Sequence, residues 1–214
     1  MASKLFSTTT AIPSFLWPVV TLIFFGCAHE LSVHPVTPPG SILETELAPD
    51  TVEVNGSDAS IQIGQVKLVE GTKSSTNQAH VQVNFRVIND GRSPIILMPR
   101  KLSLSLDDEA IPLWPYLTFI NPSGPATEAG DVEEVLILPN AAFLMVAKLK
   151  PCQPKTGCET TSDLRGAIRR ISRGVTLRFQ IIPSAPTKQA ESLSAQFAPN
   201  NWDLWWHKIR HVLD

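Results

Sequence analysis

The chain has 214 residues, of which 43% are hydrophobic and 18% charged, and its formal net charge is −2. This composition supplies enough apolar side chains for a core and excludes a wholly disordered chain. The absence of a basic excess disfavours a protein that binds the phosphate backbone of nucleic acids. The length fits one domain with appendages, and the 18 prolines favour stiff loops over a helical bundle.

Residues 1–26 have the pattern of a secretory signal peptide. Lys4 gives a positively charged start, and residues 11–25 form an apolar run that ends at the small residue Gly26. The run is short for a membrane-spanning helix, which needs about 20 residues. We therefore expect the rest of the chain to lie outside the cytoplasm.

The stretch Phe24-Phe25-Gly26-Cys27 resembles the lipobox of bacterial lipoproteins, in which a small residue precedes an invariant cysteine. The resemblance implies that Cys27 is lipidated, becomes the first residue of the mature protein and anchors it to a membrane. In a host with two membranes, Ala28 implies the outer membrane, with the domain facing the periplasm. Ordinary cleavage nearby and an uncleaved membrane anchor are the alternatives, and both also place the domain outside the cytoplasm.

Residues 27–60 are predicted to be the anchor cysteine followed by a flexible tether. Prolines and glycines recur there, as in Pro38-Pro39-Gly40, and no apolar period persists. Such a tether would let a lipid-anchored domain stand clear of the lipid headgroups.

Residues 61–184 are predicted to form an antiparallel β-sandwich. Val81, Val83, Phe85 and Val87 alternate with polar residues, which places the apolar set on one face of a strand. Short segments of this kind, separated by turn signals and each with one polar face, are typical of a sandwich. The candidate strands are 61–70, 81–87, 95–98, 102–106, 116–120, 132–138, 143–149 and 175–181.

The stretch V-x-V-x-F-x-V-x-N-D-G at residues 81–91 resembles a strand pair that opens bacterial immunoglobulin-like domains. The resemblance implies an Ig-like sandwich rather than a closed barrel. One short internal helix is also predicted, because Thr161 or Ser162 can cap its first turn, apolar residues follow at helical spacing, and Gly174 suits its end.

Residues 185–200 are predicted to be a linker, and residues 201–214 an amphipathic C-terminal helix. Trp202, Trp205 and Trp206 lie on one stripe of that helix. The stripe either packs on the chain's own sandwich or forms an exposed contact with a membrane interface or a protein partner.

Cys152 and Cys158 are the cysteines that remain after Cys27. In an oxidising compartment two nearby cysteines are expected to form a disulfide, which would close a short loop. A metal pair and a redox couple are the alternatives, although the spacing is not C-x-x-C.

Four arginines are predicted to lie on the polar side of the internal helix, where they could contact phosphate groups, lipid headgroups or an acidic partner. A solvated helical face is the default interpretation. The residues are Arg165, Arg169, Arg170 and Arg173.

His207 and His211 have the i, i+4 spacing that can place two imidazoles on one metal ion, but no third ligand is visible nearby. We expect them to be polar residues that flank the tryptophan stripe, and we expect no bound metal or cofactor. His29 and His34 follow Cys27 closely and are expected to be residues of the tether.

No nucleophile elbow, P-loop or dinucleotide-binding motif occurs in the sequence. We therefore expect a non-enzymatic lipoprotein of the cell envelope, whose sandwich is an interaction or structural module. Its expected partners are a membrane, through the N-terminal lipid, and envelope proteins, but not nucleic acid. A periplasmic protein that binds a metal or small ligand through its histidines is the alternative, and an enzyme is the third possibility.

Overall fold

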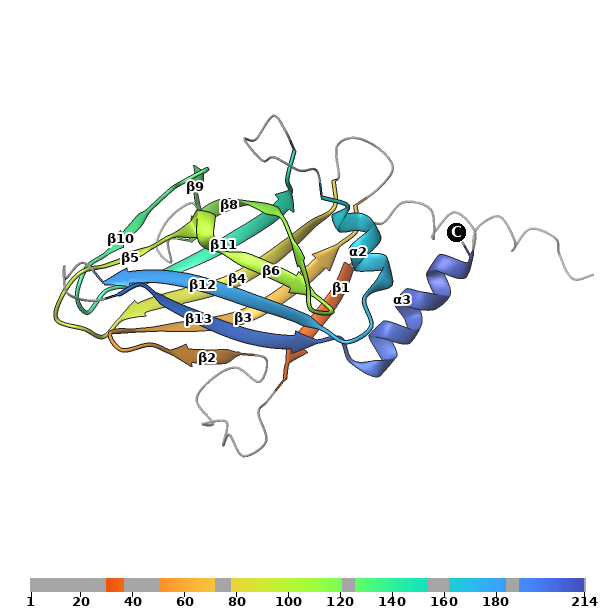
Figure 1. The fold of residues 1–214 in the computed structure, drawn as a ribbon, viewed down its shortest axis with the longest axis horizontal. Helices are drawn as coiled ribbons and strands as arrows, with labels where there is room; N and C mark the ends of the chain where they lie inside the picture. The colour runs from red at the N-terminus through yellow and green to blue at the C-terminus, as the bar shows by residue number, and fades with distance from the viewer. Residues whose placement is uncertain are drawn as a thin grey trace, which may run out of the picture.

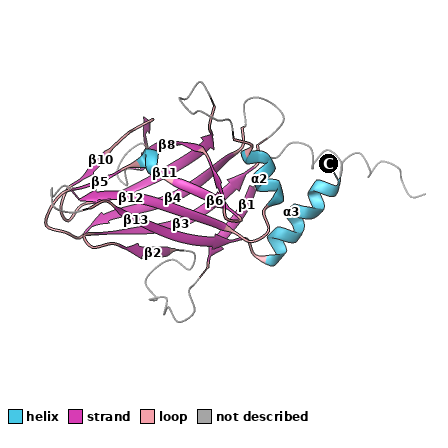
Figure 2. Ribbon diagram, viewed as in Figure 1, coloured by secondary structure: helices cyan, strands magenta, loops and turns pink. Residues whose placement is uncertain are grey.

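The computed structural model describes residues 30–36, 51–71, 78–120, 126–153, 162–183 and 189–213. Two antiparallel β-layers face each other, and the helices α2 (Leu164–Arg170) and α3 (Asn201–Leu213) lie together at one end (Figures 1 and 2). This arrangement confirms the predicted mainly β sandwich with one short internal helix and a second helix from residue 201.

All strand pairs are antiparallel, and each layer follows a fixed order. The first layer contains β2 (Val52–Asn55), β3 (Ala59–Val69), β4 (His80–Asn89), β11 (Ala142–Pro151), β8 (Leu113–Ile120) and β9 (Thr127–Gly130). The second contains β13 (Glu191–Ala198), β12 (Val175–Pro183), β5 (Ile95–Leu97) and β10 (Val135–Ile137), with β6 (Ser103–Leu106) and β7 (Glu109–Ile111) beside β12. A 3-10 turn, η1 (Pro99–Lys101), follows β5.

Strand β1 (Glu30–Pro35) joins the two layers. Its first four residues pair with β3, from Glu30 opposite Val69 to Val33, and its last two pair with β13. The side chains of Leu31 and Val33 are buried in the core. The prediction of a tether over residues 27–60 is therefore wrong for Glu30–Pro35 and for β2 and the start of β3.

Strand β13 corrects a second boundary, because it occupies most of the predicted linker 185–200. Leu193, Ala195 and Phe197 are buried on one face of β13, and serine and glutamine alternate with them. The small and polar residues weaken the apolar signal of this strand, but its pairing with β12 and β1 supplies the hydrogen bonds that a linker would lack.

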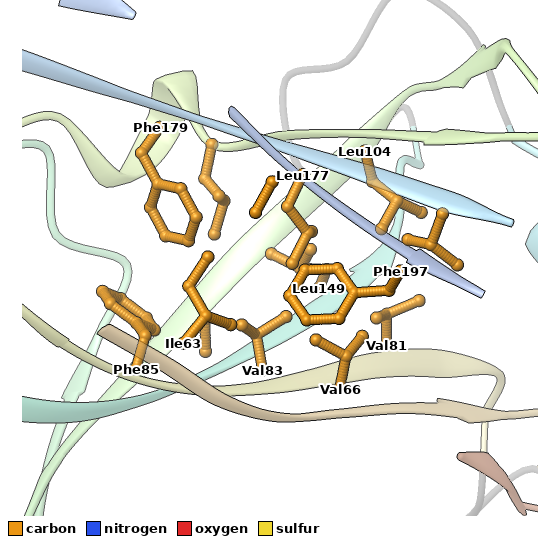
Figure 3. Packing of buried hydrophobic residues seen from close by; sticks show 14 of the residues in the cluster. Ile63, Val66, Val81, Val83, Phe85, Leu104, Leu149, Leu177, Phe179 and Phe197 are labelled. Atoms are coloured by element: carbon orange, nitrogen blue, oxygen red, sulfur yellow. The ribbon is translucent and has the colours of Figure 1, made fainter. Parts of the chain in front are cut away.

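The core lies between the two layers (Figure 3). From the first layer, Ile63 and Val66 both point inward, because the pairing of β3 with β4 shifts by one residue at Gly64. From the second layer, Phe179 packs against Phe85 of β4 with ring centroids 5.1 Å apart. These contacts fix the two layers to each other and so fix the end of the sandwich on which the helices lie.

The internal helix begins later than predicted, since Asp163 rather than Thr161 or Ser162 caps it. The Asp163 carboxylate accepts a hydrogen bond of 2.9 Å from the backbone N–H of Gly166. The helix ends at Arg170, before Gly174. Gly174 instead lies against the backbone carbonyl of Phe197, where a Cβ atom would collide.

Candidate interaction surface

Helix α3 runs beside β1 in the opposite direction. Near its start, the Asp203 carboxylate lies 3.9 Å from Nε2 of His34 in β1. Asn200 caps the helix, one residue before the predicted start, because its side-chain oxygen accepts a hydrogen bond of 2.7 Å from the N–H of Asp203. The cap and the chain direction after β13 together position α3 along this edge of the sandwich (Figure 1).

The inner face of α3 contains Leu204, which packs against the core, and His207, which is 7% exposed. Nε2 of His207 lies 3.1 Å from the backbone carbonyl of Ile168 in α2. Because a carbonyl can only accept, Nε2 carries the proton of this hydrogen bond. The contact also serves a carbonyl near the end of α2, where helix carbonyls lack partners within the helix.

A buried carboxylate connects the two helices to the sandwich. Glu70 directly follows β3 and is 1% exposed. One of its oxygens accepts a hydrogen bond of 3.0 Å from Nε of Arg169 in α2, and the other lies 3.8 Å from Nδ1 of His207 in α3. Buried charged groups are retained when they are paired and hydrogen-bonded in this way. The contacts fix the rotation of α3, and hence the face that it presents outward.

The outward face of α3 contains the three tryptophans. Trp202, Trp205 and Trp206 are 63%, 50% and 40% exposed, and we call them the Trp face. Their ring centroids lie 5.2 Å apart in the pairs Trp202–Trp205 and Trp205–Trp206 and 5.8 Å apart in Trp202–Trp206. At about 100° per residue, this stripe is opposite Leu204 and His207. The rings therefore contact one another and solvent.

The exposure of the Trp face overturns two expectations. Packing of the tryptophans on the chain's own sandwich is wrong, because the inner face of α3 is made by Leu204 and His207. The expectation that His207 is a polar residue at the flank of the stripe is also wrong, since its ring is buried between α2 and Glu70. An apolar stripe usually marks the buried side of a helix, and α3 departs from that rule.

The structure does not bring the four arginines together as one open patch. Arg169 binds Glu70, and Arg165 donates a hydrogen bond of 3.4 Å to the carbonyl of Gly71. Arg173 lies 3.4 Å from the carboxylate of Asp108, in an exposed pair. Arg170 is exposed on α2. Intramolecular contacts of three of these side chains account for much of the predicted cluster.

Two further predicted groups fall partly outside the described residues. Cys27, Cys158 and His29 lie there, so the lipid anchor and the disulfide stay predictions. Cys152 is buried after β11, and its N–H donates a hydrogen bond of 3.1 Å to Oγ of Ser162 just before α2. The side chain of His211 is also outside the described residues.

Within the described ranges, no group of three or more His, Cys, Asp or Glu side chains is placed to hold a metal ion. His207 uses Nε2 for the carbonyl of Ile168, and His34 faces Asp203. The interpretation of the histidines as metal ligands therefore gains no support from the described part of the chain.

The opposite end of the sandwich has a second apolar area. Leu136 and Leu138, in and after β10, are 56% and 57% exposed. On the first layer, Phe143 and Leu144 line an open depression of about 590 Å³ together with Arg86 and neighbouring residues. This area and the Trp face are therefore at opposite ends of the molecule.

Comparisons with known proteins give no family. No protein-family model matches the chain, and no curated protein matches it. Among solved structures, one similar chain is a candidate lipoprotein (ycdA) of Bacillus subtilis, with a TM-score of 0.41 and 12% identity over 72% of this chain and 41% of that one. The present chain thus spans about two fifths of the length of that protein.

A second similar structure is a functionally unknown protein of Listeria monocytogenes. Its TM-score is 0.38 and its identity 12%, over 70% of this chain and 82% of that one. Likenesses this weak leave the function of the present chain to its own residues. In the part of the chain that the structure describes, no helix is both long and apolar enough to cross a membrane.

Proposed function

We propose that this chain is a lipoprotein of the cell envelope whose sandwich lies directly against a membrane, where it acts as a non-enzymatic interaction or structural module. The observation that carries the proposal is the position of β1. This strand begins at Glu30, three residues after Cys27, and pairs with both layers.

The short separation limits how far the domain can stand from a lipid on Cys27. Three residues span at most about 11 Å when fully extended. The predicted tether over residues 27–60 would have reached much farther. Since β1 is part of the sandwich, a lipid on Cys27 would instead hold the end of the domain that contains Glu30, α2 and α3 close to the headgroups.

The first test is the intact mass of the protein recovered from the membrane fraction of bacteria that express the full chain. We expect the mass of residues 27–214 plus a diacylglycerol and an acyl chain. Cys27→Ser should abolish this mass, because serine offers no thiol for the lipid. Cys158→Ser also removes one thiol and serves as the matched control, which should keep the lipid.

A full-length mass without lipid, unchanged by Cys27→Ser, would overturn the proposal. A protein that binds metal through its histidines is the less favoured function. Among the described residues, His207 and His34 are engaged by other groups of the chain.

A further inference from the structure

We infer that the Trp face of α3 is a membrane anchor that lies among lipid headgroups and sets the orientation of the sandwich. The occupant of this face is then a lipid bilayer rather than a protein. The inference rests on the proposed function for one point only, the presence of a lipid on Cys27.

The first step is the place at which the chain enters the sandwich. Glu30 pairs with Val69, the last residue of β3. Glu70 is the next residue, and it contacts His207 in the middle of α3. The chain that comes from Cys27 therefore reaches β1 beside the central turns of α3.

The second step compares two lengths. Cys27 can lie no farther than about 11 Å from Glu30, and an α-helix with its side chains is about 10–12 Å in diameter. A lipid inserted in the bilayer at Cys27 therefore brings α3 within about one helix diameter of the membrane surface. No comparable constraint brings a protein partner to this face.

The third step is the chemistry of the surface. Tryptophan has an apolar ring and a polar N–H, and it is enriched where membranes meet water. The three rings form one cluster on the outside of α3. Lys208, which is also exposed on α3, can approach lipid phosphates. Together these groups match a helix that lies in the plane of the interface.

The fourth step is that α3 cannot readily turn its tryptophans inward. Its inner face is held through His207 by the carbonyl of Ile168 and by the Glu70 carboxylate. A rotation that buried the Trp face would break these contacts and expose Leu204, which packs on the core. The Trp face is therefore a fixed outer surface.

The test uses the full chain, purified from bacterial membranes and reconstituted into vesicles of phosphatidylethanolamine and phosphatidylglycerol with brominated acyl chains. Trp114 is the one tryptophan of residues 27–214 outside α3, so Trp114→Phe leaves only α3 reporters. We expect bromine to quench their fluorescence and the emission to shift to the blue, relative to unbrominated vesicles. Aqueous iodide should then quench them weakly.

A reporter at the opposite end is the matched control. Leu136 is exposed on β10, so Leu136→Trp should be tolerated. In this variant all four other tryptophans of the mature chain are changed to Phe, which keeps an apolar surface on α3. The Leu136→Trp reporter should be quenched by iodide and not by bromine.

The outcomes separate this inference from the proposed function. A lipidated protein whose α3 tryptophans respond to iodide and not to bromine would overturn the inference and leave the lipid anchor in place. Shielding from both quenchers would also overturn it, because a protein or a second copy of the chain would then cover the face. Bromine quenching in a preparation that carries no lipid by mass would support the Trp face and overturn the proposed function.

Discussion

Asp107 joins the hairpin of β6 and β7 to the loop that follows α2. Asp107 and Asp108 form a two-residue turn with positive φ angles of 49° and 72°, which aspartate tolerates better than most residues. The Asp107 carboxylate accepts hydrogen bonds from the backbone N–H groups of Ser172, Arg173 and Gly174 and from the Ser172 hydroxyl. One side chain therefore holds the exit from α2 against the sandwich.

These hydrogen bonds also control the charge of Asp107. Partial burial raises the pKa of Asp107, but the hydrogen bonds from Gly174, Arg173 and Ser172 outweigh burial and hold the pKa below its ordinary value. Because the folded pKa lies below the unfolded value of about 3.9, the ionised group stabilises the fold above that pH. This stabilisation is lost as the pH falls through the folded pKa.

We therefore predict that Asp107→Asn lowers the free energy of unfolding at pH 7 by about 1–3 kcal/mol, since an amide cannot accept as many of these hydrogen bonds. The difference from the parent should shrink as the pH falls below about 4. Urea unfolding at several pH values measures both effects. Asp108→Asn is the matched control, because Asp108 is exposed and pairs only at the surface with Arg173, so its effect should be near zero. Equal effects of the two variants would contradict the prediction.

At the scale of the element, β1 decides how the domain is attached. Leu31 is 2% exposed and belongs to the core, whereas Ser32 points away from it. We predict that Leu31→Ala lowers the free energy of unfolding by about 2–4 kcal/mol, because it leaves a cavity between the layers. Ser32→Ala is the control in the same strand and should change stability little. If residues 27–60 were a tether, neither variant would alter the urea midpoint.

The strands that the sequence pattern predicts are those with a long alternation of apolar and polar residues. Val81, Val83, Phe85 and Val87 repeat the period four times, and β4 follows them closely. In β1 the apolar period covers only Leu31 and Val33, and prolines follow. Its structure depends on pairing with β3 and β13, which are distant in the chain. Local sequence cannot supply that information.

The candidate surface was predicted in part. The helix, its tryptophans and their possible contact role could be read from the spacing, but the buried position of His207 could not. That position depends on Glu70 and Ile168, which lie on β3 and α2 far along the chain. Tertiary contacts of a single histidine therefore decided which side of an amphipathic helix faces outward.

At the scale of the whole molecule, the sandwich has two different ends. The chain from Cys27 enters at the end with α2, α3 and the Trp face, while Leu136 and the depression beside Phe143 lie at the other end. With the proposed lipid in a bilayer, the second end would point away from the membrane. Envelope partners would then meet that end, where exposed apolar side chains suit a protein contact.

The distance between lipid and sandwich should control this orientation. We predict that a Gly/Ser spacer of twelve residues, inserted between Ala28 and His29, weakens the bromine quenching of the α3 tryptophans. The lengthened segment has a root-mean-square span of about 20 Å, so the effective concentration of the Trp face at the bilayer falls. The same spacer inserted after Gly40, between β1 and β2, is the control, because it leaves the separation of Cys27 and Glu30 unchanged. Equal quenching in both proteins would mean that the Trp face binds lipid without help from the short attachment, and the orientation would then depend on α3 alone.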